Sequence, residues 1–262
     1  MDLDGTLLNN NKQIDDFTLN EIYRLRSEGM HFVVASGRRL SEIVDFTSKL
    51  RFDDGDYIIT CDGEYLYDYS LQIIWKNQYI SSEELMQVVT NGISGKIIVF
   101  TDTNDFIIGA NFLEIIARKV WYWCKKNKRV MFLHDTRKLT GNIEKVRLDI
   151  KNKEKLKGIN CRYTFTIHEV FNTYIDITAE NVNKMFALAK LLDSLQVCNS
   201  EVLYFGDDYN DIECFSNLEN TVAVQNAQKE ILECSKYTTL TNNERGVGLF
   251  LAKIKEGTIS DE

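Results

Sequence analysis

Two acidic stretches, far apart in the sequence, constrain the fold of this chain more than any other feature. The first is Asp2-Leu3-Asp4-Gly5-Thr6-Leu7-Leu8, and the second, Gly206-Asp207-Asp208-Tyr209-Asn210-Asp211, follows the apolar run Val202 to Phe205. An apolar run that ends in glycine and carboxylates is typical of a buried strand with a loop beyond it. In open α/β sheets, ligands bind beyond the carboxyl ends of the strands. We therefore expect an α/β fold in which the two stretches meet at one sheet edge.

The first stretch alone is equally compatible with a solvated turn, because Asp and Gly are ordinary turn residues and short motifs often match by chance. The second stretch favours a chemical interpretation. If the two strand ends lie side by side, they gather the carboxylates of Asp2, Asp4, Asp207, Asp208 and Asp211. So many like charges do not stay ionised together without a counter-ion, and Mg²⁺ is usually held by hard oxygen ligands, waters and a phosphate. The pattern predicts a magnesium site.

A third signal follows the predicted strand His31 to Ala35, where Ser36-Gly37-Arg38 precedes a helix expected from Leu40 to Leu50. A small hydroxyl and backbone amides at the end of a strand suit the binding of a phosphoryl oxygen. Without the acidic stretches, an ordinary helix cap would be the better interpretation. Beside them, we interpret Ser36 and Gly37 as phosphate contacts.

Four separated stretches give the chain a resemblance to the haloacid dehalogenase superfamily, and within it to the Cof-type sugar and metabolite phosphatases. They occur in the order expected for that group: the first acidic stretch, Ala35-Ser36-Gly37-Arg38, Asn183-Lys184, and the second acidic stretch. The tail segments Val222 to Ala227 and Asn243 to Val247 are also similar. The resemblance implies a Rossmann-like parallel-sheet core formed by residues 1–78 and 178–262. It also implies an inserted α/β cap domain over residues 79–177, which closes over the core and carries substrate selectivity.

The resemblance further implies a two-step transfer of a phosphoryl group to water. Asp2 would attack phosphorus and form an aspartyl-phosphate, while Asp4 would protonate the leaving alcohol and later activate water. Mg²⁺ would be held by Asp2, the backbone carbonyl of Asp4 and Asp207. The substrate expected from the resemblance is a small phosphorylated metabolite, with sugar phosphates favoured.

Other residues are assigned to phosphate binding and to positioning. Lys184 is placed by the resemblance in contact with the nucleophile and the phosphoryl group, and its position at a helix start, which is mildly unfavourable for a cation, agrees with such a role. Asn210 is a phosphate or substrate contact by the same resemblance. Asp211 is interpreted as a residue that orients the metal ligands without binding the ion itself.

Composition excludes several other classes of protein. A net charge of -8 and a pI near 5.1 argue against nucleic-acid binding, which needs a basic footprint, and the run Lys125 to Arg129 is interpreted as a solvated helix end. No apolar stretch approaches the roughly 18 residues of a membrane span. Asp2 and Asp4 stand where a secretory leader would be basic and then apolar. We expect a cytoplasmic protein with no membrane or nucleic-acid partner.

Three positions depart from the pattern of the resembling family. Asp62-Gly63-Glu64 stands where the family usually has Asn-Gly-Ala, so a direct phosphate contact by Asp62 is not expected. Met185 stands where glycine commonly follows the lysine. Only Met1 precedes Asp2, where the family has a strand of several apolar residues. Either the start of the gene product is absent from the sequence, in which case an upstream apolar segment raises stability and turnover, or another segment fills the strand position.

Two alternatives remain beside phosphomonoester hydrolysis. A sugar phosphomutase of the same architecture also fits the first motif, and a non-catalytic ligand-binding relative fits the short segment before Asp2. The presence of Asp4 argues against a dehalogenase, which does not need this second aspartate. The aromatic residues of the expected cap are interpreted as packing residues rather than sugar-stacking residues, so none enters the site: Trp121, Tyr122, Trp123 and Tyr163.

Overall fold

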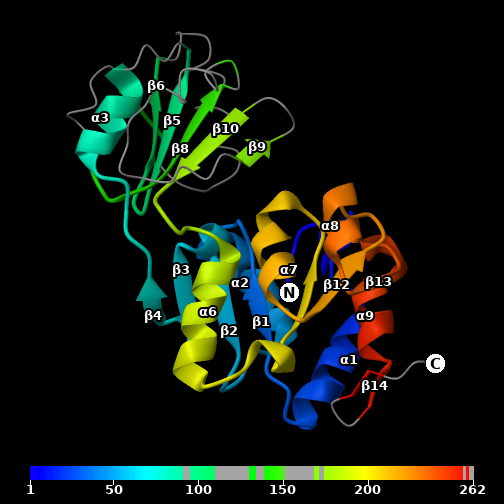
Figure 1. Ribbon diagram of the computed structural model, residues 1–262. Helices are drawn as coiled ribbons and strands as arrows, with labels where there is room; N and C mark the ends of the chain where they lie inside the picture. The colour runs from blue at the N-terminus through cyan, green and yellow to red at the C-terminus, as the bar shows by residue number, and fades with distance from the viewer. Residues whose placement is uncertain are drawn as a thin grey trace. The chain divides into compact units, whose positions relative to one another are not determined.

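The structure is a computed structural model that describes residues 1–90, 95–109, 130–133, 139–149, 151, 168–170, 174–255 and 258–259. The chain divides into two compact units. The core unit consists of Met1–Lys76 and Val182–Glu262, and the inserted unit consists of Asn77–Asn181. The junctions predicted from the sequence follow residues 78 and 177. Figure 1 colours the chain from blue at its first residue to red at its last, so that each unit can be followed.

The core strands form two groups, one on each side of the segment Met1–Asp2. In the first group, β1 and β2 are parallel and β3 and β4 continue antiparallel; the strands are β1 (Val33–Ala35), β2 (Tyr57–Thr60), β3 (Tyr65–Asp68) and β4 (Ile73–Lys76). The second group is parallel throughout and contains β11 (Leu203–Gly206), β12 (Asn220–Val224) and β13 (Tyr237–Thr239). Short, buried apolar strands are typical of a parallel sheet that is covered on both faces. The α/β fold class predicted from the sequence is confirmed.

Met1 and Asp2 occupy the position of a central strand between these groups. The amide of Asp2 donates to the carbonyl of Phe205 at 2.9 Å, and the carbonyl of Met1 accepts from the amide of Ala35 at 2.9 Å. The nitrogen of Met1 also donates to the carbonyl of Val33 at 2.7 Å. Backbone groups inside a sheet need such partners. These bonds place Asp2 between the ends of β1 and β11.

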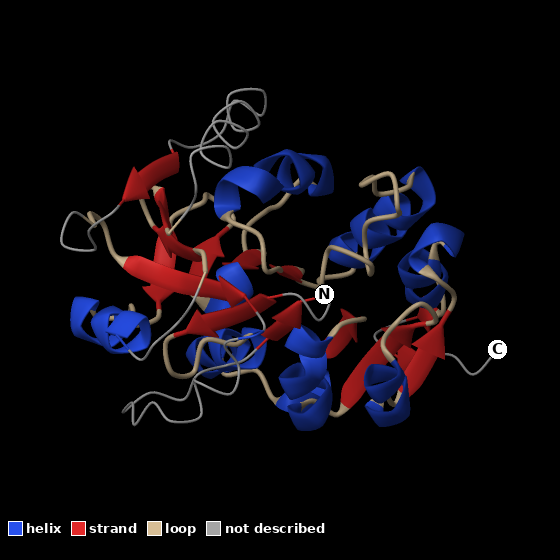
Figure 2. Cartoon of the chain, turned by 90° about the horizontal axis from the view of Figure 1, so that it is seen from above, coloured by secondary structure: helices blue, strands red, loops and turns tan. Residues whose placement is uncertain are grey.

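Helices lie on both sides of the core strands (Figure 2). One side is covered by α6 (Lys184–Leu195), α7 (Ile212–Asn217) and α8 (Lys229–Cys234). Leu188, Phe215 and Ile231 from these helices share a buried cluster with Ile59 and Tyr204 from the strands. Burial of this apolar area is the main stabilising contribution to the unit. It fixes α6 and therefore fixes Lys184 at its first turn.

The other helices of the core unit are α1 (Asp16–Ser27), α2 (Leu40–Leu50) and α9 (Gly246–Leu251). Asp15 caps α1 by accepting a hydrogen bond from the amide of Thr18 at 3.0 Å. Phe250 of α9 packs its ring against those of Phe205 and Tyr237, which ties α9 to β11 and β13. The sequence predicted a terminal helix as far as Ile254, but the helix ends earlier and β14 (Ile254–Lys255) pairs with β15 (Thr258–Ile259).

Four short 3₁₀ helices complete the core unit: η1 (Cys61–Gly63), η4 (Asn199–Glu201), η5 (Tyr209–Asp211) and η6 (Asn242–Glu244). Two of them, η1 and η5, follow directly after β2 and β11. Loops beyond the carboxyl ends of parallel strands are where α/β proteins bind ligands. These two short helices therefore belong to the edge on which the candidate site is built.

The inserted unit begins with α3 (Ser82–Thr90) and contains one six-stranded sheet in the order β7-β6-β5-β8-β10-β9. Its strands are β5 (Ile97–Thr101), β6 (Asp105–Ile108), β7 (Val130–Leu133), β8 (Ile143–Asp149), β9 (His168–Val170) and β10 (Tyr174–Thr178). A capping box at Ser81 starts α3, since the amide of Ser81 donates to Oε2 of Glu84 at 2.7 Å. That this unit acts as a cap stays a prediction.

Some expectations fall on residues outside the described part of the chain. These are the strand at 163–166, the aromatic residues Trp121, Tyr122, Trp123 and Tyr163, and the basic run 125–129. Within the described residues, none of the helices combines the length and the apolar character that a bilayer crossing requires.

Candidate active site

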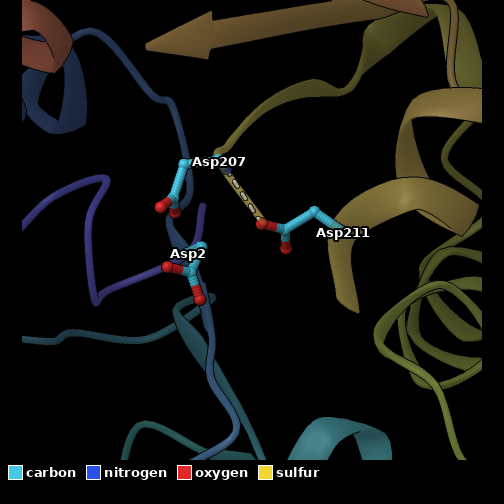
Figure 3. A group of neighbouring side chains, drawn as sticks. All are labelled: Asp2, Asp207 and Asp211. Carbon is cyan, nitrogen blue, oxygen red and sulfur yellow. Dashed lines mark hydrogen bonds between the residues drawn. The ribbon is translucent and has the colours of Figure 1, made fainter. Parts of the chain in front are cut away.

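The segment Met1–Asp2 and the loops after three strands meet at one edge of the core sheet. β1 leads into Ser36, β2 leads into η1, and β11 leads into Asp207. Asp2, Asp207 and Asp211 each offer a carboxylate oxygen to this edge, and these oxygens lie within 4.8 Å of one another (Figure 3). The two acidic stretches, which are distant in the sequence, therefore lie side by side.

Lys184 is the cation among these carboxylates. Its side chain is fully buried, and its Nζ atom lies 2.6 Å from Oδ1 of Asp2 and 2.7 Å from Oδ1 of Asp211. Burial acts to lower the pKa of Lys184, but the two carboxylates outweigh burial and raise the pKa well above its ordinary value. Asn183 caps the helix by accepting from the amide of Phe186 at 2.7 Å. This cap fixes where α6 starts, and thereby which residue enters the cluster.

Asp207 is held by the turn that follows the first acidic pair. The hydroxyl of Thr6 donates to Oδ1 of Asp207 at 2.7 Å. Gly5 has a φ of +85°, and a Cβ atom at this position would lie only 2.1 Å from Oδ2 of Asp207. Glycine is required both for the left-handed backbone and for the close approach of the carboxylate. The Gly-Thr pair thus connects the two acidic stretches physically.

The cluster holds more negative than positive charge. Three carboxylates, those of Asp2, Asp207 and Asp211, face the ammonium of Lys184, so acidic side chains outnumber basic ones in this group. Burial, helped by repulsion from Asp211, raises the pKa of Asp207 to about 7 despite the hydrogen bond from Thr6. Burial and the neighbouring carboxylates also raise the pKa of Asp2 well above its ordinary value, although Lys184 opposes this. A divalent cation would balance the excess.

The arrangement of oxygen atoms fits a hard cation. Lys184 contacts Oδ1 of Asp2, and Thr6 contacts Oδ1 of Asp207. Among the residues that the structure describes, no hydrogen bond reaches Oδ2 of either carboxylate. Carboxylate oxygens of this kind are the ligands that Mg²⁺ prefers in proteins. Asp2 and Asp207 therefore fit direct ligation of Mg²⁺.

Asp211 is engaged at both oxygens and suits a positioning role. Its Oδ1 atom accepts from Lys184 and from the hydroxyl of Tyr204 at 2.7 Å. Its Oδ2 atom accepts from the amides of Asp207 at 3.0 Å and Asp208 at 3.3 Å. The dashed line in Figure 3 marks the bond from the Asp207 amide. Asp211 thus holds the lysine and the loop that carries Asp207.

Asp4 lies in a different environment, although one residue separates it from Asp2. Its carboxylate accepts from Nε and Nη2 of Arg38 at 2.5 Å each and from Nζ of Lys12 at 2.7 Å. The side chain is 37 % exposed. Partial burial acts to raise the pKa of Asp4, but the bonds from Arg38 and Lys12 outweigh it and lower the pKa below its ordinary value. Asp4 is an ionised carboxylate at the open side of the edge.

The predicted phosphate contacts Ser36, Gly37 and Asn210 lie on the same edge, together with Asp62. Ser36 is buried, and its Oγ atom accepts from the amide of Arg38 at 3.2 Å. Asn210 donates from Nδ2 to Oδ1 of Asp62 at 2.8 Å. A Cβ atom on Gly37 would lie 2.7 Å from Oδ1 of Asp62. The Asp62 carboxylate therefore lies beside residues that the sequence assigned to phosphate.

The sequence analysis assigned no role to several residues of this edge. Arg38 was read only as part of a loop motif, and Lys12 and Tyr204 gave no signal, since their long side chains reach partners that the sequence cannot pair with them. Two further residues could have been found from the tail segments, because Asn226 lies in the first of them and Asn242 immediately precedes the second. Asn226 donates to the carbonyl of Gly5 at 2.8 Å, and Asn242 donates to the carbonyl of Leu8 at 2.8 Å, so the two amides brace the acidic turn.

Comparison with known proteins gives consistent results. The family model described as haloacid dehalogenase-like hydrolase matches residues 1–251. A curated Bacillus subtilis protein, 5-amino-6-(5-phospho-D-ribitylamino)uracil phosphatase, is 27% identical over 248 residues, which cover 94% of this chain and 91% of that protein. A crystal structure from Thermotoga maritima has a TM-score of 0.76 at 27% identity and covers 97% of this chain and 96% of the other. A haloacid dehalogenase-like hydrolase from Bacteroides thetaiotaomicron has a TM-score of 0.73 at 24% identity and covers 97% of each chain.

Proposed function

The chain belongs to the haloacid dehalogenase-like hydrolases, and from this premise we propose that it is a Mg²⁺-dependent phosphatase of small phosphomonoesters. The observation that carries the proposal is the buried contact of Lys184 with Asp2, beside Asp207, at the carboxyl ends of the core strands. A carboxylate, a fixed ammonium and a further acidic ligand at one strand edge suit the attack of an oxygen nucleophile on a phosphoryl group.

Asp2 is the proposed nucleophile. Lys184 fixes the Asp2 carboxylate at the edge formed by the loops after the core strands, and one of its two oxygens is the proposed attacking atom. In the first step this oxygen forms a bond to phosphorus while the bond from phosphorus to the leaving alcohol breaks. In the second step water attacks the aspartyl-phosphate, which releases inorganic phosphate and restores the Asp2 carboxylate. The Lys184 ammonium stabilises negative charge in both steps.

Mg²⁺ is the proposed cofactor, held by Asp2, Asp207 and the backbone carbonyl of Asp4. When bound, it would neutralise charge on the phosphoryl oxygens. The excess of negative charge around Lys184 supports a divalent ion, because burial of unbalanced carboxylates is otherwise costly. Asp211 keeps the assembly in place through the amide of Asp207 and through Lys184.

Asp4 is the proposed general acid and base. The chemistry requires a proton on the leaving alcohol and later removes one from water. In the structure, Arg38 and Lys12 keep the Asp4 carboxylate ionised, which suits the second of these roles. For the first role, Asp4 has to be protonated while the substrate is bound. Movement of the Arg38 guanidinium away from Asp4 would permit this, since the loss of that bond raises the pKa of Asp4.

The proposed substrates are phosphate esters of sugars and related polyols, and the protein is proposed to act on them in the cytoplasm. The Bacillus subtilis relative supports this class, because the compound in its name carries phosphate on a ribityl chain. We propose that the inserted unit, residues 79–177, is the α/β cap that selects among such esters. The residues that select remain to be assigned by variants of that unit.

Release of phosphate from p-nitrophenyl phosphate tests the proposal. We expect turnover that requires Mg²⁺, that is lost on addition of EDTA, and that falls by about a thousandfold or more in Asp2→Asn. Asp45→Asn, an exposed residue of α2, removes the same charge and should retain wild-type turnover. A folded wild-type protein that releases no phosphate from any sugar phosphate, nucleotide or cofactor precursor in a screen would contradict the proposal and favour a non-catalytic ligand-binding relative.

A second assay separates hydrolysis from isomerisation. The chain is incubated with a hexose monophosphate and Mg²⁺, and both free phosphate and isomeric hexose phosphate are measured. Release of phosphate without isomerised product agrees with a phosphatase. Conversion to an isomer without net release of phosphate would instead identify a phosphomutase of the same architecture.

A further inference from the structure

Asp62 lies in a short loop that its neighbours hold in place. Cys61 and Asp62 have φ values of 52° and 57°, in the left-handed region, which Asp and Asn tolerate better than most residues. The amide of Asp62 donates to the carbonyl of Ser36 at 3.1 Å, and the amide of Cys61 donates to the carbonyl of Arg38 at 2.9 Å. The loop after β2 is therefore fastened to the loop after β1, and the position of the Asp62 side chain follows from this backbone pairing.

The loop is fastened on a second side to the start of α6. Gly63 has a φ of +104°, and a Cβ atom there would lie 2.1 Å from the carbonyl oxygen of Asn183, so the two backbones are in direct contact. Asn183 immediately precedes Lys184. The Asp62 carboxylate is close enough to Lys184 to act on its pKa, in the direction of raising it. Asp62 thus lies between the phosphate loop and the catalytic lysine, and it is only 9 % exposed.

The side chain of Asp62 engages groups that would otherwise face an anion. Asn210 donates its amide hydrogen to Oδ1 of Asp62 at 2.8 Å. The same oxygen lies over the backbone at Gly37, where a Cβ atom would approach it to 2.7 Å. Within the described part of the chain, no acceptor is paired with the amide of Gly37. A carboxylate and a phosphoryl group compete for such donors, because both are anionic oxygen acceptors.

We propose that the Asp62 carboxylate competes with the phosphoryl group for Asn210 and for the loop at Gly37, and so weakens the binding of phosphate and phosphomonoesters. The inference rests on the proposed function, since it concerns the phosphate position of that same site. Either the phosphoryl group takes Asn210 from Asp62, or it binds beside a fixed like charge. Both routes reduce affinity for the bound dianion and favour release of the phosphate product.

The conservative change Asp62→Asn tests the proposal. Asparagine keeps the size of the side chain, tolerates the left-handed backbone and keeps an oxygen that can accept from Asn210, but it carries no charge. Binding of inorganic phosphate to the full chain is measured by titration calorimetry at pH 7.5 in the presence of Mg²⁺. We expect the dissociation constant to fall about tenfold in Asp62→Asn, the size of effect that removal of a nearby like charge produces.

Asp208→Asn is the matched control. It removes one carboxylate near the same edge, and asparagine replaces aspartate well at the helix-capping position that Asp208 occupies. We expect its phosphate affinity to change by less than about twofold, because a solvated charge is screened. An equal gain in Asp208→Asn would show a general charge effect and would overturn the assignment to Asp62.

The remaining outcomes also decide the question. An unchanged or weaker affinity in a folded Asp62→Asn variant, with a melting temperature near that of the wild type, overturns the inference and makes Asp62 a support for Asn210. Absence of phosphate binding in both proteins overturns it as well. If the wild type hydrolyses no ester but Asp62→Asn still binds phosphate more tightly, the inference stands while the proposed hydrolysis fails.

Discussion

Asp2 and Asp4 are separated by one residue, yet their surroundings are opposite in charge. Around Asp2, the carboxylates of Asp207 and Asp211 lie beside the buried ammonium of Lys184. Around Asp4, one carboxylate receives both the guanidinium of Arg38 and the ammonium of Lys12 at the surface. The pKa of Asp2 is accordingly raised by burial and by its neighbours, whereas that of Asp4 is lowered by its two cations.

The contrast shows how one short segment can support two chemical roles. A buried carboxylate among other carboxylates needs a cation to balance its negative charge, and its contacts fix it in place. Both properties suit a nucleophile beside a metal ion. A carboxylate at the surface between two cations can exchange partners and protons with solvent. Alternation of side chains along an extended segment would place Asp2 and Asp4 on the same face, because residues two apart share a face. The turn at Gly5 follows at once and diverts Asp4 from the cluster.

The largest expected effect comes from removal of the buried ammonium of Lys184. Lys184→Met leaves buried carboxylates without a partner, so we expect a loss of about 3–5 kcal/mol in the free energy of unfolding at pH 8, together with loss of turnover. The loss should be smaller at pH 5, where the carboxylates bind protons. Urea unfolding at both pH values measures it.

Lys190→Met provides the control for this change, because Lys190 lies on the same helix and is partly exposed. Its free energy of unfolding should change by less than about 1 kcal/mol. Equal stability of the two variants at pH 8 would mean that Lys184 does not balance the carboxylates, and the contrast between the two environments would disappear.

The next effect concerns Asp207 and the metal ion. The pKa of Asp207 in the fold, about 7, lies above its ordinary value, so its protonated form stabilises the fold at low pH. This contribution is complete below about pH 4 and is lost as the pH rises through 7. In EDTA, the stability of the wild type should therefore fall over this range more steeply than that of Asp207→Asn.

Mg²⁺ should reverse that loss. At pH 8 the proton has left Asp207 and Mg²⁺ can take its place, so we expect a rise in the melting temperature of about 4 °C or more. At pH 5.5, where a proton competes, the rise should be less than half as large. Thermal unfolding with and without Mg²⁺ at the two pH values gives the comparison. A shift of equal size in Asp207→Asn would contradict the assignment of Asp207 as a ligand.

The sequence predicted the elements of the site better than the contacts between them. The apolar run before Gly206 and the acidic residues after it predict a strand end, and this placed Asp207 correctly at the sheet edge. The interaction of Arg38 with Asp4 was not predicted, because a flexible side chain reaches across 34 positions of sequence. The left-handed backbone at Cys61 and Asp62 was likewise missed, since neither residue demands it.

Short elements were also difficult to predict, for a physical reason. Helices α7 and α8 each contain six residues, which is less than two helical turns, so their apolar positions cannot display a helical period. β13 has three residues and only partly buried side chains. Such elements form because the neighbouring β11 and β12 and the helix α6 are already in place, and their sequences carry little signal of their own.

A smaller effect is expected from the cations around Asp4. Arg38→Gln removes the bidentate partner, so the pKa of Asp4 should rise towards its ordinary value. If ionised Asp4 is the general base and attack of water limits turnover, the acid limb of the pH profile of kcat moves to higher pH by about one unit. Lys49→Gln, an exposed lysine of α2, is the control and should leave the limb in place. An unmoved limb in Arg38→Gln would remove Asp4 from the rate-determining proton transfer.

The smallest effect is expected for Lys12. Comparison of this effect with that of Arg38 shows which of the two cations lowers the pKa of Asp4 more. Lys12 is 55 % exposed and makes a single contact with Asp4, whereas Arg38 is 24 % exposed and makes two. Exposed ion pairs are weakened by solvent and salt. Lys12→Gln should therefore move the acid limb by less than about half a unit, and 0.5 M salt should remove most of that shift while sparing more of the shift caused by Arg38→Gln. If Lys12→Gln produces the larger shift of the two, solvent-exposed charge governs the pKa of Asp4. The pKa values of Asp4 and Asp2 would then differ because of exposure to solvent, and not because of the bidentate pairing with Arg38.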